Sequence, residues 1–266
     1  MRRLTVMMLI LALCGCADSR FKMPKEDYRQ QVKTLGVLPL LVDEGSTVLH
    51  PRREEVFTLL ERHNQGKQQW LVEMLREQKA YFDVREVGGE PQTTYRRLVA
   101  ASSVEGDGAA RHRRYDFNSS AVAELCRRNA VDALLVVIHN GIVRNEKRWD
   151  RDRTSLNYLQ ADYNSVVASA AVVLADGRVV WEYAGGAGDG FLDLQYPDFD
   201  EAYYNATDQV RLHFVTMDGL ARILTRRDSS LLFKSSLSQR YKVLFGAIVD
   251  GLEPGLLNRL RGGQSS

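Results

Sequence analysis

One histidine and a set of acidic residues are the side chains best suited to acid–base chemistry. His139 ends a run of branched apolar residues, and open sheets place ligands at strand ends. Asp189, Asp193 and further acids up to residue 201 follow a later strand. Together these groups could serve an envelope hydrolase or a sugar-binding enzyme. The alternative is a histidine that only forms a hydrogen bond at the sheet rim, since no Gly-x-Ser-x-Gly nucleophile turn accompanies it.

The same acidic segment is interleaved with aromatic residues. Its acids are Asp189, Asp193, Asp198, Asp200 and Glu201, and its aromatic residues are Phe191, Tyr196, Phe199, Tyr203 and Tyr204. Carboxylates could bind calcium, but the spacing is not that of the helical calcium loop, and acids near a helix start also follow from the helix dipole. Exposed aromatic residues beside charged ones are typical of protein interfaces. We therefore predict a partner interface at the five aromatic residues, and no metal.

Two further segments have compositions that are found in ligand-binding sites. The glycine-rich residues 185–190 lack the spacing of a phosphate-binding loop, so we interpret them as a turn and expect no cofactor. Residues 111–114, Arg-His-Arg-Arg, form the densest basic segment. They could contact lipid headgroups or anionic envelope polymers, or lie in a solvated loop.

The first residues carry the marks of an export signal. Two arginines precede an apolar segment, residues 4–13, that is too short to cross a bilayer. The sequence Leu13-Cys14-Gly15-Cys16 then resembles the lipobox of bacterial lipoproteins, although Cys14 is uncommon at its position. The resemblance implies that Cys16 is lipidated and becomes the mature N-terminus, with several acyl chains as a stable anchor. An ordinary secretory signal is the alternative.

The residue after the lipobox indicates the membrane in which the protein is anchored, and the net charge indicates which partners it can bind. In lipoproteins an aspartate directly after the lipidated cysteine favours the inner membrane; here Ala17 follows, which implies the outer membrane, facing the periplasm. Removing residues 1–15 takes away two of the 36 basic residues and none of the 34 acidic ones, so the charges then balance. We therefore expect no nucleic-acid partner. Cys126 is the remaining thiol, and we expect it to be buried and inert.

Five apolar segments predict strands, and helical periods separate them. The predicted strands are residues 34–42, 81–87, 132–143, 163–175 and 178–183, the last two joined by an Asp-Gly hairpin turn. The predicted helices are residues 52–81 with a break at Gly66, residues 119–128 capped by Ser119 or Ser120, one from Asp198 with a stripe from Val210 to Leu224, and one ending near Val249. Residues 102–118 are interpreted as a flexible surface loop.

This order predicts an α/β (α+β) fold, with a mixed sheet of about five strands covered by helices and a helical C-terminal third. Residues 1–15 are the predicted signal peptide and residues 16–33 a lipid-anchored tether. Residues 34–250 form a single periplasmic domain, of which residues 198–250 are the helical portion. Residues 251–266 are a flexible tail.

Three segments resemble periplasmic lipoproteins related to the curli-secretion lipoprotein and to the N-terminal domain of the translocation protein TolB. They are Leu35-Gly36-Val37-Leu38-Pro39-Leu40, Ala130-Val131-Asp132-Ala133-Leu134-Leu135-Val136 and Asp176-Gly177-Arg178-Val179-Val180-Trp181. The resemblance spans residues 34–186 and implies domains that mostly assemble, stabilise or regulate envelope machines without catalysis. The polar insert at residues 102–118 and the C-terminal third lie outside this pattern.

The sequence thus favours an outer-membrane lipoprotein that acts as a non-enzymatic binding or assembly factor of a cell-envelope complex. Its expected partners are the membrane, through the lipid, and an envelope protein. The rival hypothesis is the envelope hydrolase or sugar-binding enzyme that uses His139 and the acids of residues 189–201.

Overall fold

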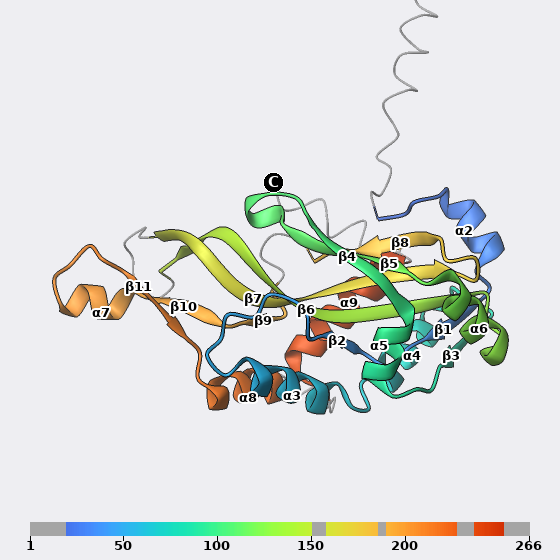
Figure 1. The fold of residues 1–266 in the computed structure, drawn as a ribbon, viewed down its shortest axis with the longest axis horizontal. Helices are drawn as coiled ribbons and strands as arrows, with labels where there is room; N and C mark the ends of the chain where they lie inside the picture. The colour runs from blue at the N-terminus through green and yellow to red at the C-terminus, as the bar shows by residue number, and fades with distance from the viewer. Residues whose placement is uncertain (1–19, 151–157, 186–189, 228–236, 253–266) are drawn as a thin grey trace, which may run out of the picture.

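The structure is a computed structural model that describes residues 20–150, 158–185, 190–227 and 237–252. Its main sheet contains seven strands within these residues, five of them in the order β3-β1-β6-β7-β8 (Figure 1). The five are β1 (Thr34–Val37), β3 (Asp83–Glu86), β6 (Ala133–Trp149), β7 (Tyr158–Leu174) and β8 (Val179–Tyr183). Two short strands, β2 (Leu41–Asp43) and β9 (Leu192–Asp193), pair with β6 and β7.

The sheet is mixed, as the sequence predicted. β1 runs parallel to β3 and to β6, and β2 is also parallel to β6. β7 runs antiparallel to β6, β8 and β9. The predicted turn at Asp176-Gly177 joins β7 to β8, and Gly177 adopts a positive φ of 89° that a glycine accepts without strain. The α/β (α+β) fold class and the five-strand path are confirmed.

The first part of the central strand, residues 133–142, is buried on both faces, and this explains the continuous apolar sequence with which the strand begins. Ala133, Leu135 and Val137 belong to one hydrophobic cluster, whereas the alternate residues Leu134 and Val136 belong to a second cluster. Because successive strand side chains point to opposite faces, a strand between two cores needs apolar residues at every position.

Helices and a hairpin cover the two faces. The first cluster includes residues of α3 (Arg53–Asn64), α4 (Gln68–Glu77), α8 (Met217–Thr225) and α9 (Gln239–Leu252). The second includes residues of α5 (Pro91–Leu98) and α6 (Ser119–Asn129). Gly66, with a φ of +69°, separates α3 from α4 at the predicted break. The N-cap of α6 is Asn118 rather than Ser119 or Ser120, because its Oδ1 accepts the Ser120 and Ala121 amides.

The predicted loop at residues 102–118 was wrong. These residues form the antiparallel hairpin of β4 (Val99–Glu105) and β5 (His112–Phe117), joined by the 3-10 helix η1 (Gly108–Ala110). Tyr115 anchors the hairpin, since its hydroxyl donates to the buried Oδ2 of Asp43 at 2.9 Å. β4 itself is exposed along nearly its whole length, so it lacks the apolar alternation by which a strand is predicted.

The C-terminal third is only partly helical, which corrects the prediction. α7 (Phe199–Tyr204) has Asp198 as its N-cap, as expected, but β10 (Gln195–Asp198) and β11 (Arg211–Phe214) flank it and pair antiparallel. The stripe from Val210 to Leu224 therefore spans a strand and a separate helix, α8, whose N-cap is Thr216. The last helix also extends through Gly251 and Leu252, both buried, into the predicted tail.

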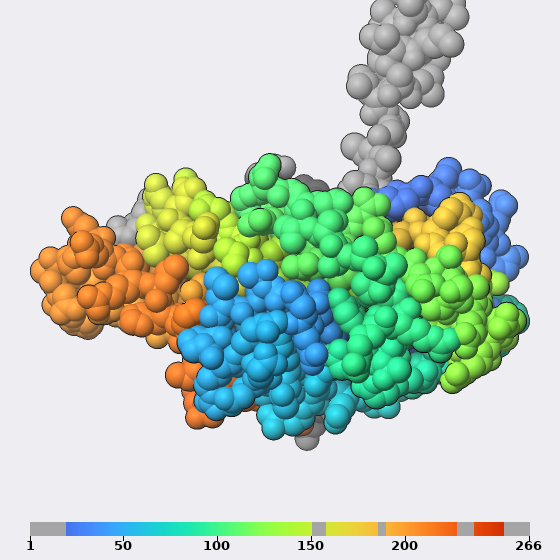
Figure 2. Space-filling view, viewed as in Figure 1, coloured from blue at the N-terminus to red at the C-terminus, as the bar shows by residue number. Residues whose placement is uncertain are grey.

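The tether prediction fails at its C-terminal end. Arg20 to Lys22 lie along β8, where the Arg20 carbonyl accepts the Glu182 amide at 2.8 Å and the Lys22 amide donates to Val180 at 2.9 Å. α2 (Lys25–Gln31) follows, and its Tyr28 is buried in the first cluster. Figure 2 shows this segment, in blue, beside the gold surface of β8. Among the described helices, none combines the length and apolarity needed to cross a bilayer.

Candidate functional site

His139 lies in the middle of β6, completely enclosed between the sheet and the C-terminal helix. Its Nδ1 is 3.1 Å from the amide nitrogen of Asn64, at the end of α3. The Oδ1 of Asn64 in turn accepts the hydroxyl of Tyr241 on α9, at 2.8 Å. Three elements that are distant in sequence therefore meet through one chain of buried hydrogen bonds.

The environment of His139 keeps its imidazole neutral. Burial lowers the pKa of His139 to about 3, because the charged form would lose its hydration. The amide of Asn64 donates to Nδ1, so the neutral tautomer carries its proton on Nε2. The rings of Phe191 and Tyr241 pack against the imidazole, with centroids 4.2 Å and 6.2 Å away. In this arrangement the imidazole joins α3 and α9 to the sheet through a hydrogen bond and ring contacts.

Among the acids of the segment that the structure describes, none pairs with His139 as predicted. Asp193 contacts Arg148 instead, with its Oδ1 3.0 Å from Nη2. Asp189 lies outside the described residues. Phe191 was predicted to be part of an exposed interface, but it is 4% exposed and seals His139 from one side. That assignment was wrong, because the apolar residue turns inward to complete the core.

The other four predicted interface residues lie on a projecting segment, residues 195–214, which we call the arm. The arm consists of β10, α7 and β11, and it extends beyond the helical layer at one end of the molecule (Figure 1). Tyr196, Tyr203 and Tyr204 are 45%, 64% and 80% exposed, while Phe199 is half-buried. Tyr203 and Tyr204 pack edge to face, with centroids 5.4 Å apart.

A groove of about 530 Å³ runs between the distal part of β6 and the arm. Arg148 of β6 positions the arm beside it: one nitrogen donates to the Gln195 carbonyl at 3.0 Å, and another lies 3.3 Å from Glu146. The guanidinium also stacks over Tyr163, 4.0 Å from the ring centroid. The lining mixes carboxylates with aromatic residues and includes Glu146, Trp149, Asp193, Tyr196, Asp198 and Phe199.

A cluster of titratable side chains lies at the N-terminal end of α7 and consists of Asp198, Glu201 and His213. Their ligand-type atoms lie within 4.8 Å of one another, so the set could hold a divalent cation through two carboxylates and an imidazole. These groups already form hydrogen bonds and ion pairs with one another and with Arg211. Asp198 caps the Glu201 amide at 2.8 Å, and Glu201 lies 3.0 Å from His213 and 3.1 Å from Arg211. The contacts fasten β11 to α7.

Sequence reasoning missed several of these residues. It ended the central strand at Val143 and began the next at Tyr163, so Glu146, Arg148 and Trp149 were not considered. The alternation of Asn145-Glu146-Lys147-Arg148-Trp149 is a weak signal of a longer strand, because one face is half-buried and the other exposed. His213 was noted only as a scattered histidine. Its contact with Glu201 depends on the register of β10 and β11, in which Tyr196 is opposite His213.

Comparison with known proteins identifies no family. No family model matches the chain, and no curated protein matches it. Among solved structures, the chain is similar to a PelC dodecamer from Paraburkholderia phytofirmans, at 12% identity. The match covers 60% of this chain and 77% of that chain with a TM-score of 0.24, which carries no argument about function.

Proposed function

We propose that this protein is an accessory factor of a cell-envelope complex, lipid-anchored in the outer membrane through Cys16 and exposed to the periplasm. It binds an envelope protein through the arm and is not an enzyme. The observation that carries the proposal is the exposed aromatic surface of the arm, formed by Tyr196, Tyr203 and Tyr204.

The arm has the physical properties of a docking surface. Tyrosine combines a large apolar ring with a polar hydroxyl and loses little conformational entropy when it is fixed, so it is frequent among residues that dominate binding. The arm also holds these rings on a braced frame. Four paired positions join β10 to β11, and Asp198 caps α7. A partner would therefore bind a surface that needs little ordering, which favours affinity.

Binding is also a better account than turnover. His139, the best catalytic candidate in the sequence, is buried, neutral and surrounded by aromatic rings. The groove beside the arm contains carboxylates, but Arg148 lies within ion-pair distance of both Glu146 and Asp193. These contacts support a surface arranged for recognition.

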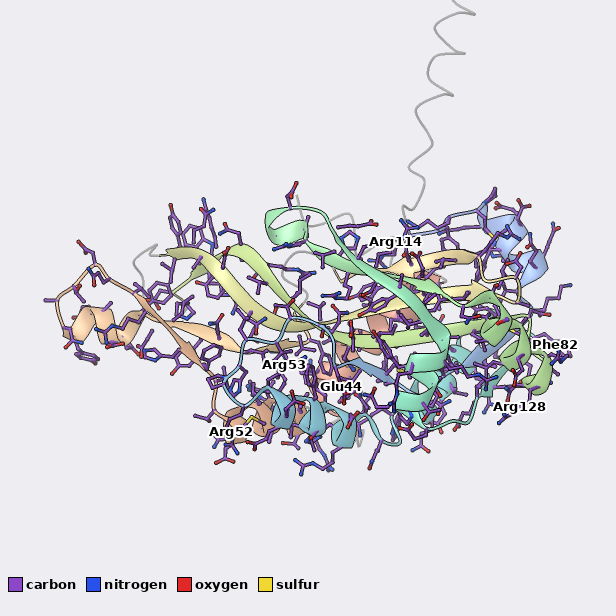
Figure 3. The ribbon with its side chains drawn as sticks, in the orientation of Figure 1. Glu44, Arg52, Arg53, Phe82, Arg114 and Arg128 are labelled. Atoms are coloured by element: carbon purple, nitrogen blue, oxygen red, sulfur yellow. The ribbon has the colours of Figure 1, made fainter. Side chains whose placement is uncertain are left out.

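The test is crosslinking in intact cells, followed by affinity recovery and mass spectrometry. Tyr203→Ala/Tyr204→Ala should reduce recovery of the envelope partner about tenfold or more, as expected for residues at the centre of an interface. Phe82→Ala is the matched control, because Phe82 is 90% exposed and lies at the opposite end of the molecule (Figure 3). Equal recovery from the two variants would refute the arm as the binding surface.

Anchoring is tested separately in the same cells. Cys16→Ala should shift the protein from the membrane fraction, and recovery of the partner should fall if tethering brings the two together. Retention of Cys16→Ala in the membrane by means that resist high salt would contradict lipid anchoring at this residue.

A further inference from the structure

The segment that follows the proposed lipid anchor covers the outer edge of β8. Arg20 and Lys22 are joined to β8 by two backbone hydrogen bonds, of 2.8 Å and 2.9 Å. Phe21 lies between them and forms an antiparallel bridge with Trp181. Because β8 is the last strand of the five-strand path, residues 20–22 occupy the edge at which a further strand would otherwise pair.

Side chains add to this attachment. The guanidinium of Arg20 lies over the ring of Tyr183, 5.4 Å from its centroid, and the ammonium of Lys22 lies 3.1 Å from Glu182. Gly251 of α9 leaves the space that Arg20 occupies, since a methyl group at Gly251 would lie 2.6 Å from a guanidinium nitrogen. Residues 20–22 therefore fit β8 and α9 through their side chains as well as through their backbone.

The attachment of the N-terminal segment has a weaker part and a stronger part. None of residues 20–22 is fully buried. In contrast, Tyr28 of α2 is 3% exposed and Val32 is 2% exposed, and both belong to the first hydrophobic cluster. Local opening begins where the fewest buried contacts must be broken. The chain can therefore separate from β8 as far as Tyr28 while the core stays closed.

The attached and detached states differ in how far the domain can move from the membrane. Cys16 precedes Arg20 by four residues, which span at most about 14 Å when fully extended. It precedes Tyr28 by 12 residues, which span at most about 40 Å. An attached segment keeps the edge of β8 beside the bilayer whatever the charge of the lipids, whereas a detached segment lets the whole domain move away.

We propose that residues 20–22 are a releasable strap, which holds the β8 edge of the domain toward the membrane and sets how far the domain can reach. The proposal rests on the lipid anchor of the proposed function, because only an anchored Cys16 turns attachment to β8 into proximity to the bilayer. The orientation follows from the short connection and requires no recognition of a headgroup. Release of the strap lets the arm meet a partner that lies farther from the membrane.

The experiment measures energy transfer from the domain to the membrane surface. The lipidated chain is purified from membranes and reconstituted into phosphatidylcholine vesicles that carry an acceptor dye on the headgroups. A donor dye is attached at Asp116→Cys, which lines a groove with Lys22 and Arg114, or at Arg52→Cys. Figure 3 shows Arg114 on the upper side of the molecule and Arg52 on the lower side. Cys126 does not interfere, because it is buried and burial raises the pKa of its thiol to about 11.

Two proline variants test the strap. Lys22→Pro releases it, because proline has no amide hydrogen to donate to the Val180 carbonyl. Lys25→Pro is the matched control, since it makes the same replacement at the first residue of α2, where proline is tolerated. Hydrogen exchange of the Glu182 amide reports attachment independently, because this amide donates to the Arg20 carbonyl. Circular dichroism checks that both variants are folded.

We expect energy transfer from position 116 to exceed transfer from position 52 in the chain with an intact strap. Lys22→Pro should remove this difference, and the Glu182 amide should then exchange about tenfold faster or more. Lys25→Pro should retain both the difference and the slow exchange. Vesicles that also contain phosphatidylglycerol should give the same results as phosphatidylcholine alone.

The failures can be told apart. Equal transfer from the two labels, or a difference that persists in Lys22→Pro, would overturn the strap while leaving the anchor intact. Unchanged exchange of the Glu182 amide in Lys22→Pro would show that the backbone contacts do not hold the segment, which also contradicts the proposal. A difference that appears only on anionic vesicles would mean that lipid charge orients the domain instead. A protein that does not float with the vesicles would refute the anchor itself, and the proposed function with it.

Discussion

His139 and His213 show how differently one residue type is used at the two ends of this molecule. His139 is completely buried, and its ring is held by Asn64, Phe191 and Tyr241. The side chain of His213 is 42% exposed and lies between acids and arginine on the arm. The first belongs to a dry network that fastens three elements, whereas the second belongs to a hydrated network that braces two strands and a helix.

The two regions differ in how much stability is lost when a polar group loses its hydrogen-bonding partner. Inside the core, a polar group that loses its partner keeps the full cost of its lost hydration. On the arm, water replaces a lost partner, so the same chemistry contributes little to stability. The core region therefore determines whether the chain folds, whereas side chains on the arm can change at little cost in stability.

Tyr241→Ala should have the largest effect. The ring is completely buried against His139 and Phe191, and truncation leaves a cavity as well as an unpaired Asn64. We expect a loss of about 3–5 kcal/mol in the free energy of unfolding, measured by urea denaturation. Tyr241→Phe, which removes only the hydroxyl, should lose clearly less. Equal losses would mean that the hydrogen bond, rather than the packing, dominates.

Acid should weaken the core through His139. Its pKa is about 3 in the folded state and about 6.5 in the unfolded chain, so the unfolded state binds the proton first as the pH falls. The stability due to neutral His139 is complete above about pH 6.5 and declines by about 1.4 kcal/mol per pH unit toward pH 3. Urea denaturation at pH 7 and pH 5 measures this slope. His139→Leu should have a shallower slope, and an unchanged slope would contradict the assignment.

Glu201→Gln should have a small effect that is confined to the arm. The substitution weakens the contacts with Arg211 and His213, whose side chains are 71% and 42% exposed. Exposed ion pairs contribute about 0.2–1 kcal/mol, so global stability should fall by no more than that. Amide hydrogen exchange should instead increase in residues 195–214. Faster exchange in β6 or α9 would show that the arm and the core are coupled.

Tyr204→Ala should have the smallest effect on stability. The ring is 80% exposed, and substitutions of that kind usually change the free energy of unfolding by less than about 0.5 kcal/mol. Thermal unfolding of the variant should therefore match the unsubstituted protein even when partner recovery is lost. A substantial loss of stability would mean that the arm is packed as part of the core. Reduced partner recovery would then result from unfolding rather than from a lost contact.

The sequence predicted the parts of the fold in which local pattern and burial agree. The central strand was evident because both faces of its first part are buried, and the turn at Asp176-Gly177 because its positive φ favours glycine. The hairpin of β4 and β5 was missed because β4 is exposed and owes its strand structure to pairing with β5. Its anchor, Tyr115 to Asp43, joins residues that only the tertiary fold brings together.

The candidate site was less predictable than the fold. Tyr196, Tyr203 and Tyr204 were correctly expected at the surface, but Phe191, only five residues before Tyr196, turns into the core. Aromatic and acidic residues alternate throughout residues 189–204, so the composition does not show which of them are buried. Burial depends on where β9 ends and the arm begins to project from the sheet. His139 was correctly placed on the central strand, but its expected position at the strand end and sheet rim was wrong, because the strand continues to Trp149 and Tyr241 of α9 packs against the imidazole.

The long pairing of β6 with β7 also bears on the order in which the chain folds. Their register runs without interruption from Ala133 opposite Leu174 to Trp149 opposite Tyr158. Closing the short connection between these strands costs little chain entropy, whereas β1 and β3 can pair only after α3 and α4 are enclosed between them. We expect the β6–β7 hairpin to form early and to provide the edge on which β1 and β2 later pair. Substitutions in the hairpin should then slow refolding, and those between β1 and β3 should mainly accelerate unfolding.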